Sequence, residues 1–349
     1  MTIDSPPPEV VRAFGLERAT FEPIDVGLIN RTFRVLVDGR PTLVLQRQHH
    51  AFRGEVNLDI EAICAHLVSR GIAVPCLVRT PDGRAWVEHE GRPWRALEHL
   101  DGVTISRVEE PSLARTAAEL VGRFHAAIDG FEHTFHFTRP GAHDTAAHLA
   151  RLEAALGLHA GHPAIEEVRP VAEAILSYQL PKVPATKARI IHGDLKISNV
   201  LFAPDLSRAV ALLDLDTFQH GTLAIELGDA LRSWCNPAGE SAESVKVDEA
   251  IFRATIEGYA STAHDLLGRD ENGRGEIESI VPGLETIALE LSSRFALDAL
   301  EDRYFAWDAT RFPSRTAHDL VRARSQLALA RSAATQRPAL QRIVDRAFT

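Results

Sequence analysis

The chain has 349 residues, of which 45% are hydrophobic and 25% charged, and its formal net charge at pH 7 is −10. This length exceeds the size at which one hydrophobic core usually suffices, so two lobes or domains are expected. The acidic balance excludes the basic surface of a non-specific nucleic-acid-binding protein. No apolar run reaches the ~20 residues of a membrane span, and residues 1–9 do not resemble a signal peptide. We therefore expect a soluble, cytoplasmic protein that binds neither nucleic acid nor membrane.

The first hundred residues predict a small, mostly antiparallel sheet with one helix. Residues 32–37 and 42–47 alternate apolar and polar side chains around a turn at Asp38-Gly39, which predicts a β-hairpin. Apolar residues recur at helical spacing over residues 58–69, and Gly71 follows as a helix terminator. Further short strands are expected at residues 74–78, 85–87 and 94–97.

From Pro111 onward, long patterns rich in Ala, Leu and Arg predict helices, most clearly at residues 113–128 and 319–334. Residues 129–145 and 268–283 are rich in glycine and polar side chains and are expected to be connections. The predicted fold class is therefore α+β and bilobal. Residues 1–99 would form a β-rich nucleotide-binding lobe, and residues 100–349 a helical catalytic and acceptor-binding lobe. A cleft between two such lobes is a favoured place for a ligand.

The strongest functional signal is a set of three oxygen-bearing side chains that follow short apolar runs in residues 190–216. Asp194 comes first, Asn199 follows five residues later, and Asp214 comes after a short hairpin. Phosphoryl transfer needs a carboxylate that orients a hydroxyl and accepts its proton, with an amide and a second carboxylate to hold Mg²⁺. We therefore expect Asp194 to be the catalytic base and Asn199 and Asp214 to be Mg²⁺ ligands. The competing interpretation is that Asp194 merely caps backbone N–H groups in a turn.

Four further residues near these three have expected roles, and two of them have more than one interpretation. Asp216 either shares the metal or bonds to loop backbone. Lys196 either reaches the γ-phosphate during transfer or lies in solvent. His192 is expected to pack and hydrogen-bond so that it holds the loop. Asp229 is expected to accept backbone N–H groups of the catalytic loop and to take no direct part in chemistry.

The nucleotide phosphates also require a cation from the small lobe, and the end of the predicted hairpin offers Arg47. Glu61 on the following helix is its expected partner, although the two could equally form an ordinary surface ion pair. Gln46 points to the opposite face of the sheet, so the choice between Gln46 and Arg47 as the phosphate contact is open. Residues 25–32 lie where a phosphate-covering loop belongs, and Asn30 within it is an expected nucleotide contact. The chain has no Walker A motif, which excludes the P-loop kinases.

Two motifs resemble those that define the aminoglycoside phosphotransferase and choline kinase superfamily. They are His192-Gly193-Asp194 with Asn199, and Asp214-Leu215-Asp216. The chain is similar in particular to the N-acetylhexosamine 1-kinase group, through residues 27–33, 44–47, 213–217 and 228–232 and through the C-terminal Arg294-Phe295 and Tyr304-Phe305. The resemblance implies a protein-kinase-like bilobal fold. It also implies transfer of a phosphoryl group from MgATP to the anomeric hydroxyl of an N-acetylhexosamine.

The same resemblance implies roles for further residues. Glu98 to Leu100 would form the hinge that contacts adenine through backbone groups, and Arg294 and Tyr304 would hydrogen-bond to the sugar. Residues 296–303 depart from the pattern of that group and shift the register of Tyr304. The alternatives are a kinase of an aminoglycoside, a choline-like amine or another sugar, and a catalytically silent binding protein. ATP or GTP as the donor and a monomer or a homodimer are left open.

Overall fold

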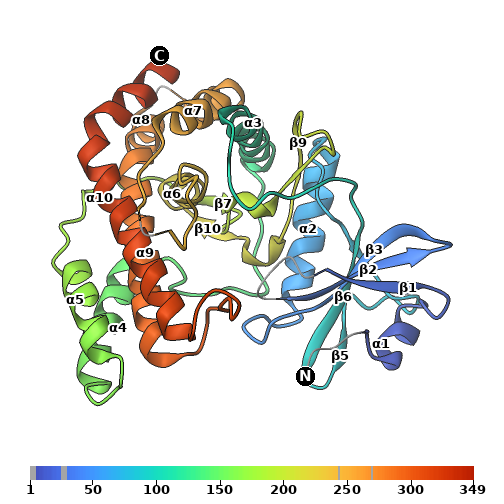
Figure 1. The fold of residues 1–349 in the computed structure, drawn as a ribbon. Coiled ribbons are helices and arrows are strands. Elements are labelled where there is room, and N and C mark those ends of the chain that lie inside the picture. Colours follow the sequence, from blue (N-terminus) through green and yellow to red (C-terminus); the bar gives the residue numbers. More distant parts are fainter. Residues whose placement is uncertain (1–4, 25–29, 243, 269) are drawn as a thin grey trace.

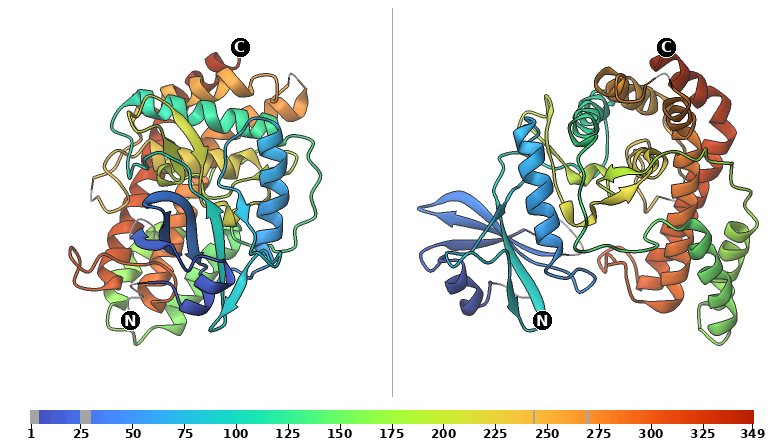
Figure 2. Two further views of the ribbon diagram at one scale, coloured as in Figure 1. Left: turned by 90° about the vertical axis from the view of Figure 1, so that its right-hand side faces the viewer. Right: turned by 180° about the vertical axis from the view of Figure 1, so that it is seen from behind.

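The computed structural model describes residues 5–24, 30–242, 244–268 and 270–349. A β-rich part built from the first hundred residues lies beside a larger helical part, and the last helices lie on the side away from the sheet (Figures 1 and 2). This architecture confirms the predicted α+β fold class. Among the described residues, no helix has the length and apolarity that crossing a membrane would require.

The small lobe is an antiparallel sheet in the order β1-β2-β3-β6-β4, with β5 paired to β6. Its strands are β1 (Thr20–Ile24), β2 (Arg31–Val37), β3 (Arg40–Arg47), β4 (Leu77–Val78), β5 (Val87–His89) and β6 (Arg92–Glu98), and the short helix α1 (Pro8–Ala13) precedes them. The predicted hairpin is β2-β3, whose turn residues Asp38 and Gly39 have φ of 51° and 74°. Phe33, Leu45 and Trp94 are buried in the core of this lobe.

The helix α2 (Val56–Ser69) connects the small lobe to the large one. It ends before Gly71, which has a φ of 76°, as the sequence predicted. The buried residues Ile60, Ile63 and Leu67 belong to the hydrophobic core of the helical part and not to the core of the sheet. In Figure 1, α2 accordingly lies between the sheet and the helices.

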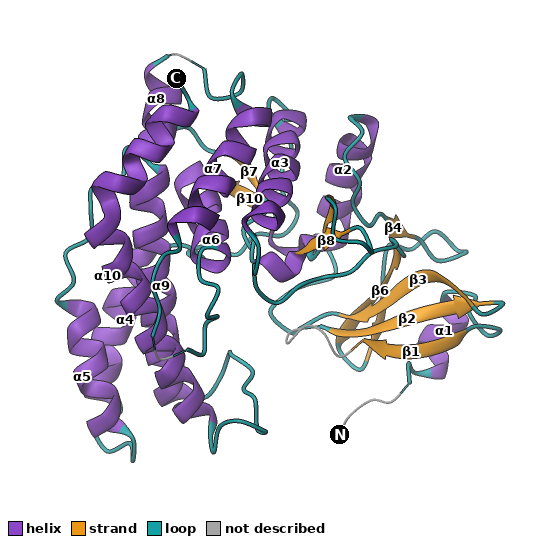
Figure 3. Cartoon of the chain, turned by 45° about the horizontal axis from the view of Figure 1, so that its top comes forward, coloured by secondary structure: helices purple, strands orange, loops and turns teal. Residues whose placement is uncertain are grey.

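The large lobe consists of packed helices and two pairs of short strands, one pair among the helices and the other on the side towards the small-lobe sheet (Figure 3). The helices are α3 (Pro111–Ile128), α4 (Thr145–Leu158), α5 (Ile165–Leu176), α6 (Leu223–Trp234), α7 (Glu249–Ala263), α8 (Glu271–Glu278), α9 (Ile280–Glu301) and α10 (Arg315–Ala347). The strands form two antiparallel pairs, β7 (Arg189–Ile191) with β10 (Gln219–Gly221) and β8 (Val200–Phe202) with β9 (Ala209–Leu212). Helix α9 packs against α4, α5, α6 and α10 and is therefore the centre of this lobe.

Residues 271–278 form α8 and α9 begins at Ile280, so the prediction of a connection over residues 268–283 was wrong for these residues. The Asp270 side chain caps α8. Pro282 lies in the first turn of α9, where the missing N–H group of proline does no harm. At Gly283 a Cβ would lie 2.3 Å from the carbonyl oxygen of Ala224, so glycine allows α9 to approach α6 closely. The glycine therefore reflects helix packing and not a loop.

Candidate active site

A cavity of about 890 Å³ lies between the sheet and the helical lobe. The predicted site residues that line it are Asn30, Glu98, Leu100, Asp194, Lys196, Asn199, Asp214, Asp216, Arg294 and Tyr304. They come from the small lobe, the strand ends near β7 and β9, and the C-terminal end of α9. Residues distant in the sequence thus meet in one place, whereas Arg47 and Glu61 do not line the cavity.

The loop after β7 brings Asp194 to the cavity. Gly193 has a φ of 77°, and a Cβ there would lie 2.7 Å from the carbonyl oxygen of Thr217, so only glycine fits without strain. The His192 side chain is fully buried, and its Nε2 atom lies 2.8 Å from the carbonyl oxygen of Leu213. This histidine therefore joins the loop of Asp194 to the strand end that carries Asp214, which is the packing role expected for it.

Asp194 is surrounded by hydrogen-bond donors. Lys196 Nζ lies 2.5 Å from its Oδ2 atom. Asn199 Nδ2 donates to the backbone oxygen of Asp194 at 2.8 Å and to Oδ2 at 3.1 Å. Burial raises the pKa of Asp194, but the charge and hydrogen bond of Lys196 outweigh burial and lower the pKa to about 2. The carboxylate is therefore ionised at neutral pH and can accept a hydrogen bond from a hydroxyl.

Asp214 presents the second carboxylate from a left-handed backbone conformation, with φ and ψ both at 60°. Its Oδ2 atom lies 3.9 Å from Lys196 Nζ. Burial raises the pKa of Asp214, and the neighbouring charges of Asp216 and Asp194 add to this effect despite Lys196. The negative charge of Asp214 is therefore not fully offset by Lys196. Together with the amide oxygen of Asn199, its carboxylate offers the oxygen ligands that Mg²⁺ prefers.

Asp216 has a different partner from the metal or loop backbone expected for it. Its side chain is 1% exposed and forms an ion pair with Arg95, whose side chain is also 1% exposed. Arg95 NH2 lies 3.1 Å from Oδ2, and Asn30 Nδ2 donates to the same oxygen at 2.9 Å. Both carboxylate oxygens therefore bind small-lobe side chains. Asp216 thus joins the two lobes through these contacts, and its role as a metal ligand stays a prediction.

The expected ion pair between Arg47 and Glu61 does not form. Glu61 accepts hydrogen bonds from Arg79 at 2.6 and 2.7 Å on the protein surface. Gln46, the neighbour of Arg47, lines the cavity, and its Oε1 atom accepts from Arg95 at 2.8 and 3.0 Å. Besides Arg34, the small-lobe cation that lines the cavity is thus Arg95, which lies opposite Gln46 in the sheet. Arg95 was not predicted as a site residue. Its strand neighbour Trp94 faces the core of the small lobe, and residues in a strand alternate between faces, so the sequence pattern does place Arg95 on the opposite face.

The residues of the predicted hinge, Glu98 to Leu100, line the cavity. The N–H group of Glu98 donates to the carbonyl of Cys76 at 2.8 Å, which fixes the start of the hinge. The N–H group of Leu100 makes no hydrogen bond within the described residues and borders the cavity. A backbone N–H group without a partner at this position can donate a hydrogen bond to an acceptor nitrogen on the edge of a purine base.

Helix α6 holds the catalytic loop through Glu226, which sequence analysis did not identify. Its two carboxylate oxygens accept the N–H groups of His192 at 2.8 Å and Gly193 at 2.9 Å, and His125 Nε2 lies 3.1 Å away. The role had been assigned to Asp229, one turn later on the same helix. Asp229 instead accepts from Arg232 at 2.7 and 2.9 Å. The sequence signal was a second acid three residues before Asp229, between apolar residues of the same helix.

The acceptor end of the cavity presents charges of both signs. The Arg294 guanidinium lies 5.6 Å from the ring centroids of Tyr304 and Phe305 and forms no ion pair with any residue that the structure describes. Asp229 Oδ2 is buried and has no hydrogen-bond partner in the described chain. Burial raises the pKa of Asp229 despite the opposing charge of Arg232, and the charge of Asp194 adds to the rise. Tyr304 accepts a hydrogen bond from Arg139 at 3.2 Å.

A two-lobed fold whose cleft holds Asp194, Lys196, Asn199 and Asp214 in this arrangement defines a small-molecule phosphotransferase. Comparison with known sequences agrees with this class. The chain belongs to the phosphotransferase enzyme family (APH), whose sequence model matches residues 20–264.

Relatives with assigned names lie within the same class. The chain is 31% identical over 265 residues to a homoserine kinase of Pseudomonas aeruginosa, covering 70% of this chain and 78% of the relative. It is 27% identical over 291 residues to a homoserine kinase of Methylobacillus flagellatus, covering 83% and 82%. The fold matches a crystal structure of an aminoglycoside phosphotransferase from Alicyclobacillus acidocaldarius with a TM-score of 0.62, at 15% identity and with 99% and 98% of the two chains covered. The two homoserine kinases support the phosphotransferase class, the crystal structure supports the fold, and none of the three supports the expected N-acetylhexosamine acceptor.

Proposed function

We propose that this protein is an ATP- and Mg²⁺-dependent kinase that phosphorylates the hydroxyl of a small amino acid of the homoserine type. The observation that carries the proposal is that the acceptor end of the cavity offers an arginine outside any ion pair among the described residues and an aspartate that keeps one carboxylate oxygen free beside its ion pair with Arg232. Arg294 is a cation without an acidic partner in the described chain, and Asp229 has one carboxylate oxygen without a donor. Homoserine carries a carboxylate for the first and an ammonium group for the second.

A neutral sugar would match these two charges less well. Charged groups that lose their water without gaining an opposite charge raise the free energy of the complex. A zwitterionic acceptor supplies both opposite charges at once and leaves its hydroxyl free. The names of the two homoserine kinase relatives point to the same acceptor.

The residues of the cleft divide the chemistry among them. Asp194 orients the acceptor hydroxyl and accepts its proton as the oxygen bonds to the γ-phosphorus and ADP leaves. Asn199 and Asp214 would hold Mg²⁺, which neutralises charge on the nucleotide phosphates. Lys196 lies between Asp194 and Asp214 and so adds positive charge where the phosphoryl group passes. Catalysis then rests on positioning and on electrostatic stabilisation.

The test is MgATP-dependent ADP release with acceptors that differ by one charged group. L-Homoserine is compared with 3-aminopropanol, which lacks the carboxylate, and with 4-hydroxybutyrate, which lacks the amine. N-acetylglucosamine, N-acetylgalactosamine, choline and kanamycin complete the panel. We expect kcat/KM to be highest for homoserine, and ³¹P NMR to show a phosphate monoester. Each missing charge should lower kcat/KM by about 10- to 150-fold, since a hydrogen bond to a charged group contributes about 1.5–3 kcal/mol.

Variants connect these losses to particular residues. Arg294→Met should remove the preference for homoserine over 3-aminopropanol, and Asp229→Asn the preference over 4-hydroxybutyrate. Asp194→Asn should bind ATP but lose turnover by orders of magnitude, which controls for a contaminating kinase. Turnover of an N-acetylhexosamine to its anomeric phosphate, with homoserine inert, would overturn the proposal. Binding of ATP without turnover of any acceptor in the panel would also count against it.

A further inference from the structure

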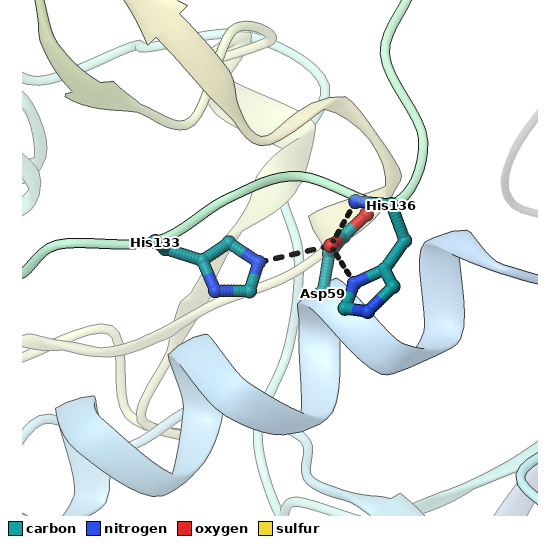
Figure 4. A group of neighbouring side chains, drawn as sticks. All are labelled: Asp59, His133 and His136. Atoms are coloured by element: carbon teal, nitrogen blue, oxygen red, sulfur yellow. Dashed lines mark hydrogen bonds and ion pairs between the residues drawn. The ribbon is translucent and has the colours of Figure 1, made fainter.

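Three side chains able to bind a metal converge outside the catalytic cavity. Asp59 lies on α2, the helix that connects the two lobes, whereas His133 and His136 lie on the loop between α3 and α4. Figure 4 shows both imidazole rings turned towards the same carboxylate. His133 Nε2 and His136 Nδ1 each lie 2.9 Å from Asp59 Oδ1, and the three ligand atoms lie within 4.8 Å of one another.

Backbone groups fix the Asp59 carboxylate independently of the two histidines. The N–H group of His136 donates to Oδ1 at 2.8 Å, and that of Phe137 donates to Oδ2 at 3.0 Å. Backbone donors that orient a carboxylate in this way are a usual feature of the second shell around a bound metal. Oδ1 meets three nitrogen atoms, whereas Oδ2 meets one. A single cation bound by the two imidazoles would replace two of the three N–H groups that crowd Oδ1.

The negative charge of the buried Asp59 carboxylate also favours binding of a cation. The Asp59 side chain is 2% exposed and forms no ion pair with a lysine or arginine anywhere in the described ranges. With both imidazoles neutral the cluster carries a buried negative charge, which is costly without a positive partner. The His136 side chain is 51% exposed, so an ion can enter from solvent and keep a water ligand on that side.

We infer that Asp59, His133 and His136 form a binding site for one Zn²⁺-like transition-metal ion that links α2 to the loop beside the acceptor end of the cavity. Two imidazole nitrogens and one carboxylate oxygen, with a fourth position open to water, are a common ligand set for zinc. Mg²⁺ prefers oxygen ligands throughout, so this site is chemically distinct from the one at Asn199 and Asp214.

The position of the site gives it a role in holding the acceptor pocket. Phe137 and Arg139, just beyond the histidines, line the catalytic cavity, and Arg139 donates to Tyr304 at 3.2 Å. A metal at the cluster would join this segment to α2 by coordinate bonds. The loop would then be fixed against α2 more firmly than by hydrogen bonds alone.

The test uses Co²⁺ as a visible probe on chelator-treated full-length protein. Excess Mg²⁺ is present so that the oxygen ligands of the catalytic site are occupied. We expect one equivalent of Co²⁺ to produce visible absorption bands that Zn²⁺ then abolishes. His133→Gln and His136→Gln should each weaken Co²⁺ and Zn²⁺ binding by more than about 100-fold, because loss of an outer-shell partner alone costs up to about that much. His264→Gln is the matched control, since its ring faces a single surface carboxylate, 3.7 Å away on Asp265.

Two further measurements make the outcome decisive. Circular dichroism verifies that the variants fold, which we expect for His136→Gln because that side chain is half exposed. X-ray absorption at the zinc edge should show two imidazoles and oxygen ligands at about 2.0–2.2 Å. Equal affinity in the wild-type protein and His136→Gln, or a shell of oxygen alone, would overturn the inference. The cluster would then be a hydrogen-bonded link between the loop and α2.

Discussion

Replacement of Glu226 by glutamine tests whether α6 holds the catalytic loop. Glu226 is fully buried and receives the N–H groups of His192 and Gly193 and the ring nitrogen of His125. Burial raises its pKa, but the hydrogen bond and charge of His125 outweigh burial, so the pKa of Glu226 is lowered overall. The folded protein therefore prefers the ionised form, and Glu226→Gln removes that charge at nearly constant volume.

The expected loss of stability follows from the three contacts. A glutamine side chain has one oxygen that accepts hydrogen bonds, whereas Glu226 uses two. Its amide nitrogen must therefore face an N–H group that Glu226 accepts, and that donor loses its acceptor. One unpaired buried donor costs about 1–3 kcal/mol, and the hydrogen bonds that remain weaken by about 1 kcal/mol each when the acceptor becomes neutral. We therefore expect the free energy of unfolding to fall by about 3–5 kcal/mol. Because the folded pKa is lowered, this stabilisation is present above the unfolded pKa of ~4.3 and is lost as the pH falls through the folded value.

Urea unfolding followed by circular dichroism at pH 7 and at pH 4 measures this effect. Steady-state kinetics well below the unfolding midpoint should show a lower kcat with little change in the KM for ATP, because the loop carries Asp194. The matched control is Glu257→Gln, which removes a half-exposed partner of Arg115 and should change stability by less than about 0.5 kcal/mol. Unchanged stability and unchanged kcat in Glu226→Gln would refute the assignment.

Three other substitutions have defined outcomes. Arg95→Met leaves the Asp216 carboxylate buried and unpaired, so urea unfolding should show a loss of about 3–5 kcal/mol, partly recovered when Asp216→Asn is added. Gly193→Ala puts a Cβ 2.7 Å from the Thr217 carbonyl oxygen, so turnover should fall sharply while calorimetry still detects ATP binding. Burial and the charge of a nearby acid raise the pKa of Asp319 to about 7, so the wild-type protein should lose stability as the pH rises from about 4 to 7. Thermal unfolding of Asp319→Asn across this range should show a flatter dependence, and an identical slope in both proteins would contradict this.

Features set by the local chain could be predicted from the sequence. The β2-β3 hairpin and α2 followed from alternation, helical spacing and the glycines at their ends. Asp194 and Asn199 lie five residues apart, so one loop brings them together, and Asp214 follows from the short hairpin after them. In each case few residues separate the groups, and the backbone itself fixes their distance.

Contacts between distant strands could not be predicted in the same way. The pairing of Gln46 with Arg95 depends on the register of β3 against β6, which no local pattern fixes. Arg47 was therefore chosen as the cavity cation, and Glu61, which binds Arg79, as its partner. Glycines in residues 268–283 were read as loop signals because a sequence does not show how closely two helices pack.

The buried ion pair between Arg95 and Asp216 limits how the two lobes can be exchanged between relatives. A chimera that joins this small lobe to another large lobe will place a guanidinium against whatever residue occupies the position of Asp216. Without an acid there, the joined protein will lack a matched contact between its halves. Chimeras within this family should therefore fold best when Arg95 and Asp216 come from the same parent. Libraries of such chimeras can be limited to members that keep this pair.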